Sequence, residues 1–232
     1  MDPTALAHYQ HSALLALERG RRLDQWLKRE TGNGLVGAPW RIDPHVRTLT
    51  FADAQPMRFE VLATVDASDQ SLVWSWANPS VENPALTAQA SRFRDRAARE
   101  AVEILTRETV STAELDPLIA LAIAVDWCDA DVGYCARHGD GAMLLLLEDQ
   151  GVVSEPGYDA TSLVADYTVI IRTLPVDHRL VLEAWLDRTS RPYNKDEYLT
   201  SFQLSDAGLV RARFDPLNRC VEFVVSGNQG GD

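Results

Sequence analysis

The chain has 232 residues, of which 46% are hydrophobic, and its 34 acidic and 22 basic residues give a formal net charge of -12 at pH 7. This length and hydrophobic content are typical of a globular protein with one large domain or two small ones. The acidic balance argues against binding to nucleic acid or to an anionic membrane, both of which are usually recognised by a basic face, and is compatible with a basic protein partner.

The sequence predicts a cytoplasmic protein. Its first ten residues, MDPTALAHYQ, lack the apolar region of a signal peptide. The longest apolar stretch, Leu118 to Val125, is far shorter than the ~20 residues of a membrane span. The three cysteines are an odd number, so we expect free thiols in a reducing compartment.

The chain is expected to begin with one long helix. Asp2-Pro3 provides an N-cap followed by a first-turn proline, which is a favoured way to open a helix. Apolar residues then keep helical spacing from Leu6 to Leu27, and Gly32-Asn33-Gly34 predicts the end. Gly20 is expected to be a weak point in this helix.

Three segments with alternating apolar residues follow, and they predict an antiparallel meander of strands at 47–52, 58–65 and 71–77. In the third segment Leu72, Trp74 and Trp76 would share one face. Two tryptophans represent a large apolar surface that another element must cover.

The next helix is the expected cover for these tryptophans. Asn83-Pro84 repeats the cap-and-proline signal, and apolar residues that include Phe93 and Ile104 hold one face through about six turns, up to Leu105. After a further cap at Asp116-Pro117, residues 118–127 are apolar on all sides and predict a buried helix. The short apolar run 142–147 predicts a buried strand of the same sheet.

Residues 149–160 contain Gly151, Pro156 and Gly157 and are the best linker candidate. Beyond them we expect a helix over 163–174, a second helix capped by Asp177, and a hairpin formed by 209–214 and 220–225. The predicted fold class is therefore α+β: an antiparallel sheet covered on one face by helices, with a C-terminal helix pair and β-hairpin. The predicted division is a core domain over residues 1–150 and a C-terminal extension, 151–232, packed on that core.

Three segments after the N-terminal helix carry a resemblance to a known family. They are WRIDPHVRTLTFA (Trp40–Ala52), RFEVLATV (Arg58–Val65) and VWSWANPS (Val73–Ser80). In these segments the chain resembles an uncharacterised bacterial domain family marked by a strand of the form tryptophan-x-tryptophan-alanine-asparagine. The resemblance covers about the first 150 residues and implies a fold pattern, but no activity or catalytic residue.

Two constellations suggest chemistry. The segment from Asp126 to His138 offers Cys128, Cys135, His138 and Asp131 as donors for a metal such as zinc, although cysteines seven residues apart are not typical ligand spacing. Free core thiols are the simpler interpretation. Asp177-His178 with Cys220 could be imagined as a base and a nucleophile, but no family-type cysteine or serine motif accompanies them.

The leading hypothesis is a non-enzymatic interaction protein, of an immunity or inhibitor type, that binds a protein partner through its acidic surface and an exposed sheet edge. No cofactor is expected. Trp74, Trp76 and Asn78 are the candidate binding residues, since tryptophan is enriched at interaction hot spots, and core packing of the two tryptophans is the simpler interpretation. The alternative is a small-molecule or metal-assisted hydrolase with its site at Asp126–His138.

Overall fold

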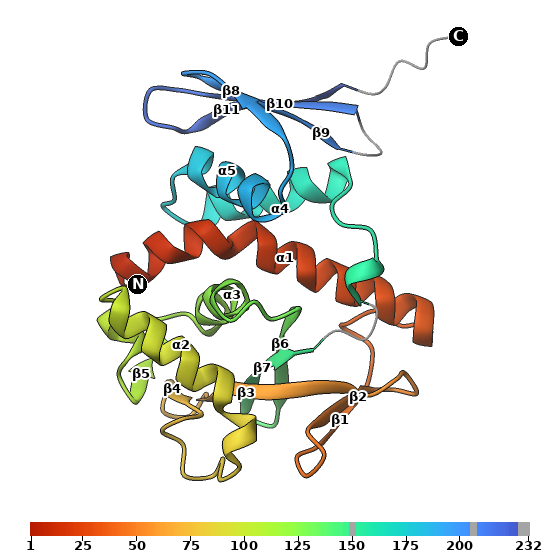
Figure 1. The fold of residues 1–232 in the computed structure, drawn as a ribbon, viewed down its shortest axis with the longest axis vertical. Helices are drawn as coiled ribbons and strands as arrows, with labels where there is room; N and C mark the ends of the chain where they lie inside the picture. Colours follow the sequence, from red (N-terminus) through yellow and green to blue (C-terminus); the bar gives the residue numbers. More distant parts are fainter. Residues whose placement is uncertain (149–151, 205–207, 227–232) are drawn as a thin grey trace.

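The computed structural model describes residues 1–148, 152–204 and 208–226. Two antiparallel sheets lie at opposite ends of the molecule, with helices between them (Figure 1). The larger sheet contains β1 (Trp40–Asp43), β2 (Thr48–Phe51), β3 (Met57–Asp66), β4 (Ser71–Trp74), β5 (Thr109–Ser111), β6 (Val132–His138) and β7 (Gly141–Leu147). The smaller sheet has the order β11 (Cys220–Ser226), β10 (Gly208–Phe214), β9 (Leu199–Leu204) and β8 (Tyr193–Lys195).

The helices form the layers between and beside these sheets. They are α1 (Pro3–Thr31), α2 (Ala88–Arg99), α3 (Pro117–Trp127), α4 (Ala160–Thr173) and α5 (His178–Arg188). Short 3-10 turns are η1 (Pro84–Leu86), η2 (Glu103–Leu105) and η3 (Val152–Ser154). Among the described residues, none of the helices combines the length and the apolar character that a bilayer span requires. The predicted α+β class with antiparallel sheets is confirmed.

Helix α1 forms as predicted and runs through the middle of the molecule (Figure 1). The Asp2 carboxylate accepts hydrogen bonds from two backbone N–H groups of the first turn, and Gly32, with φ of 73°, closes the C-terminus. The helix continues through Gly20 without a break. It contributes to three apolar clusters: Ala5 to one with α2 and α3, Leu14 to one with the smaller sheet, and Leu23 to one with β1 and β2.

Strand β3 organises the larger sheet, because it pairs with β2 near its start, with β4 near its end and with β7 along most of its length. The pairing shifts between Val61, which is opposite Leu145, and Ala63, which is opposite Leu144. Leu62 is the extra residue of this β-bulge. The bulge changes which side of β3 faces which cluster, so Val61 packs toward β1 and β2 while Ala63 packs toward α2 and α3.

The predicted packing of α2 on the tryptophan strand is confirmed. Trp74 is completely buried, its ring centroid lies 5.4 Å from that of Phe93 in α2, and Ile104 belongs to the same cluster. The strand ends at Trp74, however, and residues 75–77 form a turn, so Trp76 does not continue the alternation.

The prediction of a six-turn helix up to Leu105 is wrong, because α2 ends at Arg99. Ala101 has φ of 56°, and the N–H of Val102 donates to the carbonyl of Ala97, which turns the chain out of the helix. Val102 is fully buried as a result. Residues 103–105 form η2 and place Ile104 and Leu105 in the same core by a separate route.

The C-terminal elements follow the predicted order. The carboxylates of Asp159 and Asp177 cap α4 and α5, and β10 and β11 form the predicted hairpin. Strands β8 and β9, which the sequence analysis did not predict, extend this hairpin into a four-stranded sheet. Of the predicted linker 149–160, residues 149–151 lie outside the described residues. The division of the chain into 1–150 and 151–232 stays a prediction.

Candidate binding groove

An open groove with a volume of about 720 Å³ runs along α1, between α3 on one side and α4 on the other. Its lining is mostly apolar, and we call it the α1 groove. Its floor is Tyr9, Ala13, Ala16, Leu17 and Gly20 of α1, and its walls include Leu118, Leu121 and Val125 of α3 with Val169, Ile170 and Thr173 of α4.

Part of the groove floor is formed by small residues of α1. Ala13, Ala16 and Gly20 are spaced three and four residues apart, so they share one face of the helix. A Cβ atom at Gly20 would meet no atom within 4 Å, which shows that the groove is open above it. A partner can therefore approach the α1 backbone closely at this point.

The walls and the floor of the groove leave large apolar side chains exposed to solvent. Val169 is 58% exposed, Leu118 is 53% exposed and Leu17 is 38% exposed. Single exposed apolar residues are normal on a protein surface, but a contiguous apolar concavity marks a binding site. These three side chains lie around one groove, and this arrangement makes it the strongest candidate site among the described residues.

The rim of the groove carries three carboxylates and one guanidinium. Arg21 forms a bidentate pair with Asp166, with Nε–Oδ2 and NH2–Oδ1 distances of 2.6 Å, and this hydrogen bonding raises the pKa of the guanidinium. Asp116 caps α3 by accepting from the N–H of Leu118 at 2.7 Å. Burial, together with the charge of Asp116, raises the pKa of Tyr9 to about 12, so its hydroxyl stays protonated.

Asp24 is the third rim carboxylate. Burial alone would raise its pKa, but hydrogen bonds from Lys28, at 2.6 Å, and from the N–H of Leu35, at 2.7 Å, outweigh burial and lower it. Asp24 is therefore ionised at neutral pH, and the rim is acidic.

The C-terminal helices are held on α1 by a buried carboxylate, Glu18, which is 1% exposed. Its Oε2 accepts from the indole N–H of Trp185 at 2.8 Å, and its Oε1 accepts from the backbone N–H of Tyr158 at 3.2 Å. The guanidinium groups of Arg22 and Arg191 reach the same Oε1 at 3.2 and 3.4 Å. These contacts join α1, α5 and the segment before α4 around one charge.

Tyr158 extends this network to the groove wall. Its hydroxyl lies 3.0 Å from Oδ2 of Asp166 and 3.3 Å from the carbonyl of Leu14. Burial and the charge of Asp166 raise the pKa of Tyr158, so the hydroxyl remains a donor. On the other side, Asp126 of α3 accepts from Arg188 of α5 at 3.0 Å. Ser12 of α1 donates to the same carboxylate at 3.3 Å. Both walls are thus tied to α1 by polar contacts, which indicates a preformed groove.

The predicted binding residues lie away from this groove. Trp74 is 0% exposed and belongs to the core. Trp76 is half-buried beneath the guanidinium of Arg94, which lies 5.1 Å from its ring centroid. Asn78 donates to the hydroxyl of Thr64 at 2.9 Å. The structure therefore gives Trp74 no surface for a partner, and a binding role of Trp76 and Asn78 stays a prediction.

The proposed metal ligands are not brought together. Cys128 caps the end of α3, with its Sγ 3.6 Å from the carbonyl of Gln89, and burial raises its pKa to about 11. Cys135 and His138 are three residues apart in β6, so they point to opposite faces of the strand, and Asp131 precedes that strand. Within the described part of the chain, no three His, Cys, Asp or Glu side chains are arranged to hold a metal ion.

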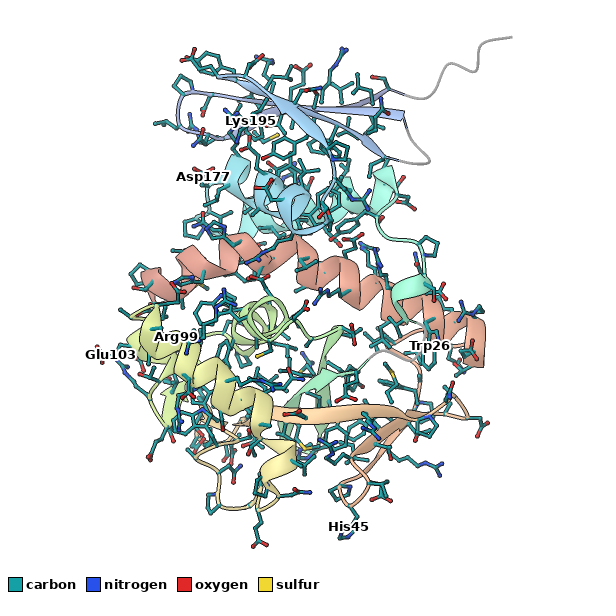
Figure 2. All side chains as sticks on the ribbon, viewed as in Figure 1. Trp26, His45, Arg99, Glu103, Asp177 and Lys195 are labelled. Carbon is teal, nitrogen blue, oxygen red and sulfur yellow. The ribbon has the colours of Figure 1, made fainter. Side chains whose placement is uncertain are left out.

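Asp177, His178 and Cys220 do come together, but not as a nucleophile and its base. Nδ1 of His178 accepts from the backbone N–H of Cys220 at 3.0 Å, while the thiol lies 3.4 Å from the carbonyl of Glu222. Burial raises the pKa of Cys220 and lowers that of His178. Asp177 caps α5 at its start (Figure 2) and accepts from the Asn218 amide at 2.8 Å. This arrangement keeps the thiol protonated and fixes the hairpin on α5.

Sequence reasoning missed the groove residues, although one signal for them is present. Ala13, Ala16 and Gly20 form a stripe of small residues at helical spacing, and Gly20 was interpreted only as a weak point. Such a stripe indicates close approach of another element, but it does not say whether that element belongs to the same chain. The walls, which come from residues about 100 and 150 positions later, carry no matching local signal.

Comparison with known proteins identifies the family of the chain but gives no activity. The model described as "Family of unknown function (DUF6882)" matches residues 6–150. No curated protein and no solved structure matches the chain. The matched region contains α1 and α3, the floor and one wall of the groove, whereas α4 follows it.

Proposed function

We propose that this chain, which belongs to the family of unknown function DUF6882, is a cytoplasmic interaction protein that binds a protein partner in the α1 groove. A single observation carries the proposal: an open apolar groove runs along α1 and leaves Leu17, Leu118 and Val169 exposed. The buried Glu18 network supports it, because a preformed groove loses little conformational entropy on binding.

The occupant that fits this groove is an amphipathic helix of the partner. The part of the floor from Ala13 to Gly20 covers eight residues of α1, or about 10 Å along the axis at 1.5 Å per residue. This is about two turns, enough for apolar anchors at positions i, i+3 or i+4, and i+7 of a docked helix. The helices on both sides make the groove a continuation of a helical layer, so a further helix packs there by ordinary ridges-into-grooves contacts.

The charge of the groove selects a basic partner. Three carboxylates, those of Asp24, Asp116 and Asp166, line the groove against one guanidinium, that of Arg21, and the whole chain has a net charge of -12. Complementary charges accelerate encounter and exclude acidic competitors. We therefore expect lysine or arginine beside the apolar anchors of the partner. A chain that binds a helix of its partner in this way acts as an immunity or inhibitor protein does.

A model peptide tests the proposal without knowledge of the natural partner. The probe is a fluorescent helical peptide of fourteen residues with leucine on one face and lysine elsewhere, and its binding is followed by anisotropy. A second peptide with glutamate in place of lysine tests the charge. We expect saturable binding of the lysine peptide only.

Gly20→Leu is the decisive variant. The new side chain fills the groove, and since a Cβ at Gly20 meets open space and leucine favours helix, the fold is retained. Binding should weaken at least about tenfold, the loss of roughly one buried apolar anchor. The control is Glu30→Leu, an exposed residue of the same helix outside the groove. Absence of binding to the native protein, or equal binding by both variants, would overturn the proposal.

A further inference from the structure

The two edges of the four-stranded sheet differ in how they are protected from pairing with another strand. At one edge, β8 has three residues, follows Pro192 and ends at Lys195 (Figure 2). Short length, proline and lysine are the features by which natural proteins protect edge strands. At the other edge, β11 has seven residues, with the sequence CVEFVVS. Its pairing with β10 shifts between Glu222, opposite Arg213, and Cys220, opposite Phe214, so Val221 is the extra residue of a bulge. The regular part, 222–226, contains no proline and no lysine.

The side chains of β11 lack full cover on both faces of the sheet. Val221 is 51% exposed, and Val224, on the outer face, is 42% exposed. On the inner face Phe223 and Val225 are half-buried, with the ring of Phe223 5.4 Å from that of Tyr167 in α4. The apolar layer beneath the sheet therefore extends to this edge and stays open there.

Among the described residues, no strand pairs with β11 on the side away from β10. In an antiparallel ladder every second residue points its N–H and C=O groups away from the paired strand. Such a row of groups is a template for a further strand. We propose that β11 pairs antiparallel with β11 of a second copy of this chain, so that the two four-stranded sheets become one continuous sheet.

The sequence of β11 is complementary to itself about Phe223. A two-fold axis at this residue places Phe223 opposite Phe223 of the second copy, within the regular part of the strand. Glu222 then faces Val224 of the second copy, so the two carboxylates do not oppose each other. Aromatic and β-branched pairs across neighbouring strands are favourable.

Local charge does not oppose the pairing, although each chain has a net charge of -12. Arg213 in β10 donates to Glu222 at 2.9 Å, which neutralises the charged residue of β11 within its own chain. Arg211 lies opposite Val224 in the β10–β11 register and adds a positive charge beside the proposed contact.

Analytical ultracentrifugation over a range of protein concentrations tests the dimer with two charge variants at one position. Val224→Glu places two carboxylates opposite each other twice in the dimer and should weaken association about fivefold or more. Val224→Lys places an ammonium group opposite Glu222 and should leave association unchanged or stronger. Position 224 is exposed, so both variants keep the fold. The control is Gln203→Glu on the same sheet, in β9.

Hydrogen exchange gives a second readout that needs no variant. Amides of residues 222–226 that point away from β10 should become protected as the protein concentration rises. A native protein that is monomeric at every concentration would overturn the proposal, as would a dimer that Val224→Glu and Val224→Lys affect equally. Pairing of β11 with a strand of another protein, in place of a second copy, would also overturn it.

Discussion

Replacement of Glu18 by leucine tests how the C-terminal helices are held on α1. The change leaves the indole N–H of Trp185 and the backbone N–H of Tyr158 buried without an acceptor. Each such donor costs about 1–3 kcal/mol, so the two together should lower the free energy of unfolding by about 2–6 kcal/mol. The guanidinium groups of Arg22 and Arg191 lose their carboxylate as well. Because the Nε atoms of both are buried and Arg191 also lies over the Trp185 ring, this loss adds to the cost.

Equilibrium unfolding in urea, followed by tryptophan fluorescence, measures this loss. Glu18→Gln should be intermediate, because its carbonyl oxygen can keep the Trp185 hydrogen bond while its amide group faces the donor of Tyr158. Glu30→Gln, an exposed change in the same helix, is the control and should shift stability by less than about 0.5 kcal/mol. A loss below about 1 kcal/mol for Glu18→Leu would refute the role assigned to this carboxylate.

Three further predictions concern the core and the thiols. Gly20→Ala should raise the free energy of unfolding by about 0.5–1 kcal/mol, since the new methyl group meets open space and alanine favours helix. Thermal melts measure this change, and a lower stability of the variant would contradict the open groove floor. Trp74→Ala should cost about 3–5 kcal/mol of unfolding free energy. Trp74→Phe should cost less, because the indole N–H of Trp74 has no partner among the described residues and no hydrogen bond is lost. Equal losses would contradict this assignment. Burial holds the pKa of Cys128 at about 11, above its ordinary value of 9.0. The contribution of this buried thiol to stability is therefore present below pH 9 and lost between pH 9 and 11. Alkylation of the native protein that is already fast at about pH 8 would show that the thiol is not buried.

The elements that the sequence predicted correctly are those whose signals are local. Asp2, Asp116 and Asp177 each accept from N–H groups two or three residues ahead, so the helix starts can be recognised without knowledge of the fold. The strand 142–147 was recognisable because a short apolar run between turn signals has few alternatives.

The elements that the sequence analysis missed depend on distant partners. Strands β5 and β8 have three residues each, too few for a pattern, and exist because β4 and β9 offer them hydrogen bonds. The end of α2 is set by the burial of Val102, which the helical periodicity cannot show. The bulge at Leu62 likewise follows from the register with β7, a strand about 80 residues later.

The candidate site shows the same division most clearly. The sequence by itself determined α1, with its cap, its length and its stripe of small residues, since all of these depend on neighbours within one or two turns. Only the tertiary structure decided that Leu118 and Val169 lie on either side of that stripe and that the groove stays open above Gly20. The physical reason is that a groove is formed by packing between residues more than 100 positions apart, whose side chains are placed by buried contacts such as those of Glu18 and Asp126.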